Sequence, residues 1–327
     1  MIKVIDLDTD NKEFSPSVIG LGNFDGVHIG HRTIMNKVID EANRRGIDSS
    51  ILLFKQHTNE VFPKMPPYYI SSLQDKIDIL DDLGIDKVFI IDFTMEFAQL
   101  TNDEFILDFI KDRLNASVLV SGEDYTYGKK SLGTVKELRQ YEAQGLIEVY
   151  TVDDFFYKGD LISSTIVREL ISDGDFQEVT QILNMPYTIR ANVVHGYKRG
   201  KKLLGFPTAN LQLDFSYIMP GEALYLTNVI LDGKKYPSMT SVGTNPTFTD
   251  EKTIKIETYI IDFDQNLYGE NIRLEFLKKM RDQIKFNSPD ELIEQMESDE
   301  KEARLYFNIE LEKLKNIKTV YIYNFLW

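Results

Sequence analysis

The chain has 327 residues, a net charge of −15 and no cysteine. The absence of cysteine excludes disulfides, and the acidic balance argues against nonspecific nucleic-acid binding, which requires a basic surface. No apolar run approaches the roughly 20 residues needed to cross a bilayer. Charges at Lys3, Asp6, Asp8 and Asp10 leave no readable signal peptide. We therefore expect a cytoplasmic protein with neither nucleic acid nor membrane as a partner, and the oligomeric state stays open.

Up to about residue 185, short apolar runs alternate with stretches that repeat apolar residues at helical spacing. This alternation predicts a parallel sheet with helices on both faces. The expected strands are 17–21, 50–54, 87–91, 117–120 and 146–150, and the expected helices are 32–45, 71–83, 102–114 and 134–144. Ligands of such sheets bind beyond the carboxyl ends of the strands, so the segments that follow the strands are the candidates for a site.

The first of these segments is GNFDGVHIGH, residues 22–31, which connects the first expected strand to a helix. His28 and His31 then lie at a helix N-terminus, where unpaired N–H groups and the helix dipole favour an anion. A helix cap or a zinc site are the alternatives, but the chain has only two further histidines and no cysteine to complete a metal site. The glycines Gly22, Gly26 and Gly30 allow close backbone approach, so we interpret the segment as a phosphate-binding turn.

Two later segments are expected at the same edge of the sheet. SGEDYTYGKKSLG, residues 121–133, mixes acidic, aromatic, glycine and lysine residues. This composition suits a segment that binds a ring and a phosphate, and a solvated loop is the alternative. ISSTIVR, residues 162–168, begins a helix, and a cap would account for one of its hydroxyl residues. Three hydroxyls followed by Arg168 are more than a cap needs, and together they can hold a triphosphate.

After Pro186 the pattern changes to runs rich in β-branched and aromatic residues, broken by Gly and Pro. The runs at 187–194, 224–231, 236–242, 253–262 and 271–276 predict a small antiparallel barrel. A helix is expected over Pro289–Lys315, followed by an aromatic stretch at 321–327. The predicted fold is thus α/β: a Rossmann-like parallel-sheet domain over 1–185, then a β-barrel domain with a C-terminal helix over 186–327.

The barrel carries a second glycine-rich and basic segment, HGYKRGKKLLGFPTAN, residues 195–210. A loop of this composition can wrap the phosphates of a nucleotide. The Thr208 hydroxyl and the Asn210 amide oxygen at its end suit a hard cation such as Mg²⁺.

These motifs together resemble one family over nearly the whole chain. The strand, glycine turn and HxGH of the first half resemble the nucleotidyltransferase superfamily, and the wording FDGVHIGH is similar to that of bacterial FAD synthetases, which are bifunctional riboflavin kinases and FMN adenylyltransferases. The resemblance implies transfer of AMP from ATP to FMN by the first domain, giving FAD and pyrophosphate. It implies phosphorylation of riboflavin to FMN by the second domain, with Mg²⁺ as the cofactor.

The resemblance also implies a role for individual residues. His28, His31 and Arg168 match the residues that stabilise the transferring phosphate, and Glu257 in KIETYI matches the base of the kinase. The residues that match ATP contacts are Gly22, Asn23, Phe24, Gly30, Ser164, Thr165, Gly200 and Lys201. The residues that match flavin contacts are Phe54, His57, Asp124, Tyr125 and Tyr127, with tyrosine where phenylalanine is usual at 125 and 127.

The second half departs from the family pattern in its phosphate loop. Four residues lie between Gly200 and Gly205 where three are usual, and ALYL stands at 223–226 where GVYA is usual. An enzyme with adenylyltransferase activity alone is therefore one alternative, and a non-catalytic flavin-binding regulator is another. Adenylylation of a different small phosphate is disfavoured because the second half resembles a flavin kinase.

Overall fold

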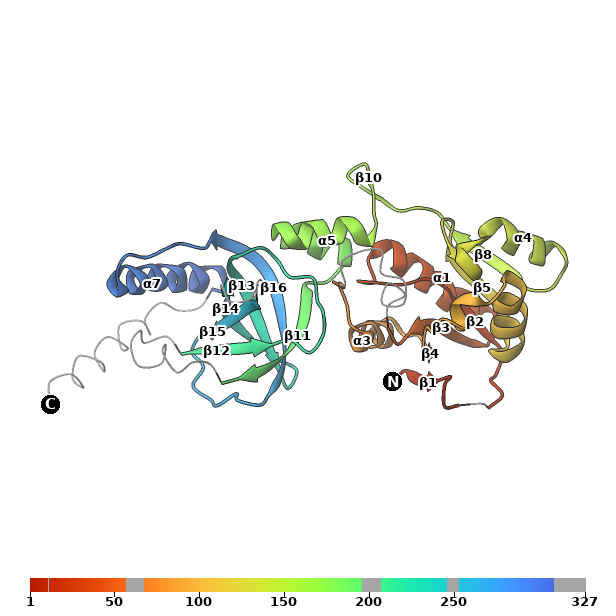
Figure 1. Ribbon diagram of the computed structural model, residues 1–327, viewed down its shortest axis with the longest axis horizontal. Coiled ribbons are helices and arrows are strands. Elements are labelled where there is room, and N and C mark those ends of the chain that lie inside the picture. The colour runs from red at the N-terminus through yellow and green to blue at the C-terminus, as the bar shows by residue number, and fades with distance from the viewer. Residues whose placement is uncertain (11, 57–67, 196–206, 246–252, 309–327) are drawn as a thin grey trace. The chain divides into compact units, whose positions relative to one another are not determined.

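The computed structural model describes residues 1–10, 12–56, 68–195, 207–245 and 253–308. The chain forms two compact units that alternate along the sequence (Figure 1). The first unit contains Met1–Glu169, Gln181–Met185 and Ser216–Ile218, and the second contains Leu170–Thr180, Pro186–Phe215 and Met219–Trp327.

The first unit is built on a six-stranded sheet whose neighbouring strands are all parallel. Its strands, in spatial order, are β1 (Lys3–Asp6), β4 (Lys87–Ile91), β3 (Asp48–Phe54), β2 (Ser17–Gly20), β5 (Ala116–Gly122) and β8 (Glu148–Val152). The chain runs outward from β2 through β3 to β4, and then returns to the other side of β2 to form β5 and β8. The direction of winding therefore reverses between β2 and β5, which is where open α/β sheets bind their ligands.

Both faces of this sheet are covered by helices, because successive strand residues point to opposite faces and both sets are apolar. On one face, strand residues such as Val18 and Ile51 pack with α1 (Ile29–Arg45) and α3 (Leu73–Leu83). On the other, residues such as Ile19 and Leu52 pack with the π-helix η2 (Glu104–Arg113) and with α4 (Val135–Ala143).

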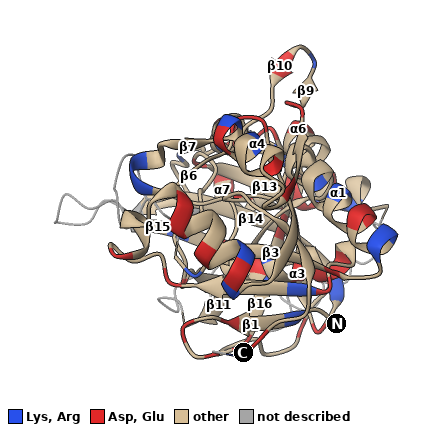
Figure 2. Ribbon diagram, turned by 90° about the vertical axis from the view of Figure 1, so that its right-hand side faces the viewer, with Lys and Arg blue, Asp and Glu red and all other residues tan. Residues whose placement is uncertain are grey.

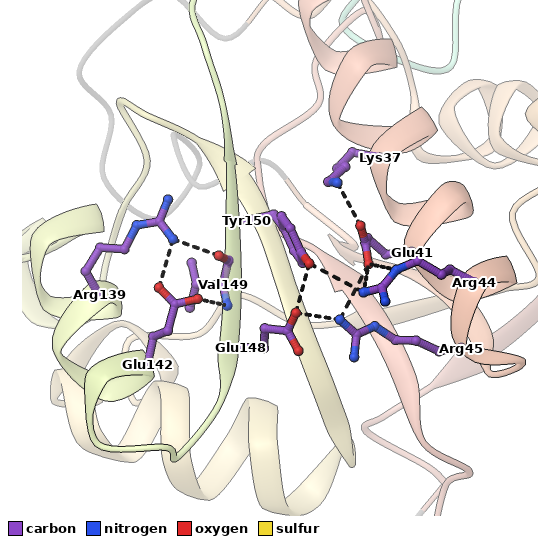
Figure 3. A network of polar contacts seen from close by, with 9 residues as sticks. All are labelled: Lys37, Glu41, Arg44, Arg45, Arg139, Glu142, Glu148, Val149 and Tyr150. Carbon is purple, nitrogen blue, oxygen red and sulfur yellow. Dashed lines mark hydrogen bonds and ion pairs between the residues drawn. The ribbon is translucent and has the colours of Figure 1, made fainter.

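A network of charged side chains joins the C-terminal end of α1 to β8 (Figure 3). The buried carboxylate of Glu41 accepts from Lys37 at 2.7 Å and from Arg44 at 2.6 Å, and Arg45 reaches it at 3.5 Å. Arg45 also pairs with Glu148 of β8 at 2.5 Å. Charges of both signs lie along α1 (Figure 2), so the negative charge of Glu41 is compensated almost entirely within its own helix.

Short elements complete the first unit. They are η1 (Phe97–Gln99), β6 (Thr126–Tyr127), η3 (Lys129–Ser131), β7 (Gly133–Thr134), β9 (Phe156–Tyr157) and β10 (Asp160–Leu161). Two further helices, α5 (Ser164–Asp173) and α6 (Phe176–Leu183), follow them, and Leu170–Thr180 within this stretch belongs to the second unit.

A segment distant in sequence completes the first unit. Tyr69 and Tyr217 form an isolated parallel bridge, in which Tyr69 N donates to Ser216 O at 2.9 Å and Ile218 N donates to Tyr69 O at 2.8 Å. The Tyr217 hydroxyl donates to Asp75 at 2.5 Å, and Tyr217 is 2% exposed. Residues 216–218 therefore belong to the first unit although their neighbours in sequence belong to the second.

The second unit is a closed antiparallel barrel. In order round the barrel, its strands are β11 (Tyr187–Val194), β12 (Thr208–Gln212), β15 (Thr253–Ile260), β14 (Lys234–Asn245), β13 (Ala223–Leu231) and β16 (Asn271–Asp282). The helix α7 (Pro289–Tyr306) packs through Ala303 against Leu226, Met239 and Tyr259. Its buried Arg304 pairs with Asp262 at 2.8 Å and so attaches the helix to the end of β15.

The predicted fold class is confirmed, and the differences lie in short or polar elements. Sequence patterning missed β1, β12 and α6, which span four, five and eight residues. Such elements are too short to establish a period, and β12 is half-exposed along most of its length. The expected helix at 102–114 is a π-helix over Glu104–Arg113. The helix expected to reach Lys315 is described to Tyr306, and residues 321–327 lie outside the described part of the chain.

Candidate functional site

The turn between β2 and α1 has an unusual backbone. Phe24, Gly26 and Val27 have φ values of 49°, 82° and 44°, all in the left-handed region. A Cβ on Gly26 would lie 2.8 Å from the Ile70 side chain, so glycine is required there both by conformation and by space. This conformation costs Phe24 and Val27 roughly 1–3 kcal/mol each in steric strain. Both side chains are fully buried in the core. The core therefore holds the turn in one shape.

The two histidines of this turn stack on each other at the start of α1. Their ring centroids are 3.6 Å apart with an interplanar angle of 19°, and the Phe24 ring meets His31 edge-on at 5.3 Å. His28 is the N-cap residue, and its Nδ1 accepts from the backbone N–H of His31 at 3.4 Å. Since Nδ1 accepts, a neutral His28 carries its proton on Nε2 and can donate it to a ligand.

Burial keeps both imidazoles neutral at neutral pH. Desolvation lowers the pKa of His28 to about 4, although Asp25 opposes the shift. The pKa of His31 lies well below its ordinary value because of burial and because His28 and Lys76 are close. The histidines therefore offer hydrogen-bond donors rather than positive charge, and any cationic character of the site has to come from other side chains.

Asp25 is the residue that joins the turn to the rest of the site. It is 2% exposed, and its carboxylate accepts from the backbone N–H of Ile70 and of Ser71, each at 3.1 Å. Arg168 Nη2 donates to Asp25 Oδ2 at 2.5 Å, and Ser164 Oγ donates to the Asp25 carbonyl at 3.0 Å. One side chain thus brings together three segments that are far apart in sequence.

The hydroxyl residues at the start of α5 have different roles. Ser163 Oγ accepts from Ile166 N at 3.4 Å, as an N-cap does, so the alternative interpretation as a cap holds for this residue. Ser164 contacts Asp25, and Thr165 is exposed. Ser164 and Arg168 therefore lie beside the histidine turn, as expected if the two segments share a site, and Thr165 is open to a ligand.

Lys76 of α3 lies behind the same turn. It is 8% exposed, and its Nζ donates to the Asn23 carbonyl at 3.0 Å. Burial lowers its pKa, and the neighbouring charge of Asp25 opposes that shift. Asn23 is exposed, whereas the Phe24 ring is buried. In this part of the turn a nucleotide can therefore reach the backbone but not the Phe24 ring.

Two of the predicted flavin residues, Phe54 and Asp124, lie at the carboxyl ends of β3 and β5. Phe54 ends β3 and packs edge-on against Phe93 at 4.8 Å, while Asp124 follows β5 and is exposed. Tyr125 is half-buried and stacks on Tyr127 at 6.0 Å. Tyr127 is 5% exposed and also stacks on Phe105, so its ring belongs to the core. His57 lies outside the described residues.

The barrel brings together the residues expected to form the kinase site. Asn210 of β12 and Glu257 of β15 are directly opposite each other in the ladder, and Thr208 is opposite Tyr259. Residues two apart in a strand point the same way, so Thr208, Asn210 and Glu257 share one face. Glu257 is partly exposed and pairs with Lys255, also on this face, at 2.8 Å. Gly200 and Lys201 lie outside the described residues.

Sequence reasoning missed Asp25 and Lys76. Asp25 lies inside the segment GNFDGVHIGH, but the sequence does not show which residues it contacts. Lys76 lies in LQDKIDIL, where a lysine between acidic residues is typical of a solvated helix face. Neither residue had a local signal of burial. In the part of the chain that the structure describes, no helix is long and apolar enough to span a membrane.

Comparison with known proteins identifies the family of the chain. The family model described as FAD synthetase matches residues 10–166, and the model described as riboflavin kinase matches residues 183–307. The bifunctional riboflavin kinase/FMN adenylyltransferase of Listeria monocytogenes is 36% identical over 89% of this chain and 92% of its own length. The protein of the same name from Bacillus subtilis is 35% identical over 91% of this chain and 94% of its own length.

Among solved structures, a Streptococcus pneumoniae protein described as a macrolide-efflux protein superposes with a TM-score of 0.84 at 33% identity. The superposition covers 93% of this chain and 99% of that protein. The two family models match the two halves of the chain, and the relatives match it over almost its whole length. The chain belongs to the family of bifunctional riboflavin kinases/FMN adenylyltransferases.

Proposed function

We propose that the protein makes FAD from riboflavin in two ATP-dependent steps, one in each unit. The barrel phosphorylates riboflavin to FMN, and the parallel-sheet unit transfers AMP from ATP to FMN. The observation that carries the second step is the stacked His28–His31 pair at the N-terminus of α1, joined through Asp25 to Arg168 and Ser164. Neutral N–H donors and a helix N-terminus there suit a phosphate.

In adenylyl transfer, a phosphate oxygen of FMN attacks the α-phosphorus of ATP, the bond from that phosphorus to the bridging oxygen breaks, and pyrophosphate leaves. His28 and His31 donate hydrogen bonds to the phosphate oxygens as charge moves onto the leaving group. Arg168 adds a cationic donor, and Ser164 and Thr165 add hydroxyls. No covalent intermediate on the protein is needed, because positioning and electrostatic stabilisation are sufficient for this chemistry.

The remaining ATP and flavin contacts are assigned by their place at this edge of the sheet. Gly22, Asn23, Phe24 and Gly30 supply the backbone of the nucleotide turn, with the Phe24 ring acting from the core. Phe54, His57, Asp124, Tyr125 and Tyr127 are proposed for the flavin side. Phe54 ends β3 and Asp124 follows β5, and these are the two strands on either side of β2, which supports this assignment.

In the barrel, Glu257 accepts the proton of the terminal hydroxyl of riboflavin, whose oxygen attacks the γ-phosphorus of ATP and displaces ADP. Thr208 and Asn210 offer oxygen donors on the same face, which fits Mg²⁺. Mg²⁺ bound there with ATP would offset the charge of the phosphates. Gly200 and Lys201 are proposed to hold those phosphates.

We also propose that the protein acts in the cytoplasm on small molecules, without nucleic acid or membrane. A chain free of cysteine and carrying a net charge of −15 supports this assignment.

The test uses the full chain in two incubations, riboflavin with Mg-ATP and FMN with Mg-ATP, followed by separation of the flavins. FMN formation from riboflavin and FAD formation from FMN are expected, and failure of either removes that half of the proposal. His28→Ala should lower FAD formation about a hundredfold and leave FMN formation intact. Glu257→Gln should do the reverse. Wild-type FAD formation by His28→Ala would contradict the assigned site.

A further inference from the structure

Lys76 is a buried lysine that the reaction described above does not use. Only 8% of the residue is exposed, and its ammonium group has three donors. One of them reaches the Asn23 carbonyl at 3.0 Å. Among the described residues, no carboxylate lies within ion-pair distance of Lys76 Nζ, whereas a buried lysine ordinarily has such a partner.

The charged groups around the histidine turn are not all paired. Asp25 brings one negative charge and Arg168 neutralises it at 2.5 Å, while both imidazoles are neutral at neutral pH. Asp25 and Asp75 act on Lys76 through space, but among the described residues neither carboxylate lies within ion-pair distance of its ammonium group. A buried charge without an ion-pair partner destabilises the folded chain, and a bound polyphosphate would offset that effect.

We propose that Lys76 is a positioning residue for adenylyl transfer, which holds the Asn23 carbonyl and supplies the fixed positive charge behind the histidine turn that attracts the phosphates of ATP and pyrophosphate. The inference rests on the proposed adenylyltransferase function. The role is electrostatic and structural, since Lys76 lies beneath the turn and contacts its backbone.

The same unit contains a matched control. Lys87 is 7% exposed, so it is buried to the same degree, but it pairs with Asp48 and donates to Ser15 Oγ at 2.6 Å. It is the first residue of β4, at the amino ends of the strands, whereas the site lies at their carboxyl ends. Lys87 is therefore a buried lysine with a counterion and no place in the chemistry.

The experiment compares Lys76→Met and Lys87→Met in the full chain. In Lys76→Met, kcat/KM for FAD formation should fall about a hundredfold, with KM for ATP and the inhibition constant of pyrophosphate both raised. FMN formation from riboflavin should be unchanged. Because a buried charge without an ion-pair partner is removed, the thermal midpoint without ligand should stay level or rise by about 2–5 °C. Lys76→Arg should recover at least about tenfold over Lys76→Met.

Lys87→Met should show the opposite pattern, with a lower thermal midpoint and nearly wild-type FAD formation, because Asp48 loses its partner. The proposal is overturned if Lys76→Met keeps wild-type kcat/KM, or if it loses stability as Lys87→Met does. If the wild-type protein forms no FAD, the proposed function is refuted. If the wild type forms FAD and Lys76→Met is equally active, only the role of Lys76 is refuted.

Discussion

Among the described residues of the first unit, Asp25 and Glu41 are buried carboxylates that are paired in opposite ways. Glu41 is 5% exposed, and its partners Lys37, Arg44 and Arg45 lie three or four residues away on the same helix (Figure 3). Asp25 is 2% exposed, and its partners Ile70 and Arg168 are 45 and 143 residues away.

The difference separates a stabilising network from an assembled site. Partners three or four residues apart meet as soon as a helix forms, and such pairs contribute to stability wherever the helix lies. The partners of Asp25 meet only when the turn after β2, the segment before α3 and the start of α5 are all in place. We therefore expect changes at Asp25 to affect catalysis and changes at Glu41 to affect stability.

The largest effect should follow from Asp25→Asn, which keeps the shape of the side chain but removes its charge. Arg168 then loses its ion-pair partner, and the turn loses its tie to α5. FAD formation should fall about a thousandfold, measured as kcat/KM with FMN and Mg-ATP. FMN formation in the same protein is the internal control. An Asp25→Asn protein that retains a tenth of wild-type FAD formation would contradict the role of Asp25.

A smaller loss should follow from Ser164→Ala, which removes the hydroxyl that donates to the Asp25 carbonyl. We expect kcat/KM for FAD formation to fall about tenfold, since one neutral hydrogen bond is lost. Ser163→Ala is the matched control, because it removes only the cap of α5 and should cost about 1 kcal/mol of stability with little effect on rate. Equal rates for the two variants would show that Ser164 is also only structural.

Glu41→Gln should leave FAD formation unchanged and lower the free energy of unfolding by about 1–3 kcal/mol, read from urea midpoints. The hydrogen bond from Lys37 is the first cause that lowers the pKa of Glu41 to about 2. Because this pKa is below its ordinary value of 4.5, the stabilisation is present above about pH 4.5 and is lost as the pH falls towards 2. The difference in the free energy of unfolding between the wild type and Glu41→Gln should therefore become smaller from pH 6 to pH 3. A constant difference would show that the carboxylate charge is not responsible for the stabilisation.

The smallest effect should come from Tyr127→Phe. The Tyr127 hydroxyl is buried and has no hydrogen-bond partner among the described residues. Removing a buried hydroxyl without a partner should be neutral or should raise the free energy of unfolding by up to about 1 kcal/mol. A clear loss of stability would show that the hydroxyl has a partner, and a fall in FAD formation would support a flavin contact.

The sequence predicted those parts of the fold that depend on local periodicity. The alternation of strands and helices placed β4 at the observed residues, and the glycine turn placed His28 at the start of α1. The face shared by Asn210 and Glu257 could not be predicted, because it depends on the register between β12 and β15.

The burial of polar residues could not be predicted from the sequence either. Lys76 and Asp25 are buried by segments that are distant in sequence, and their neighbours in the chain give no sign of it. The ring of Tyr127 is covered by Phe105 of η2, which the aromatic pattern of its own loop does not indicate. The assignments of the ATP, flavin and metal residues remain predictions for the experiments above.

The bridge between Tyr69 and Tyr217 has a practical consequence for anyone who wishes to express one half of this protein. A fragment that stops at residue 185 omits residues 216–218, which complete the first compact unit and cover Tyr69 immediately before the backbone groups that bind Asp25. A shortened recombinant protein would thus lack a piece of the adenylyltransferase half that is encoded within the kinase half.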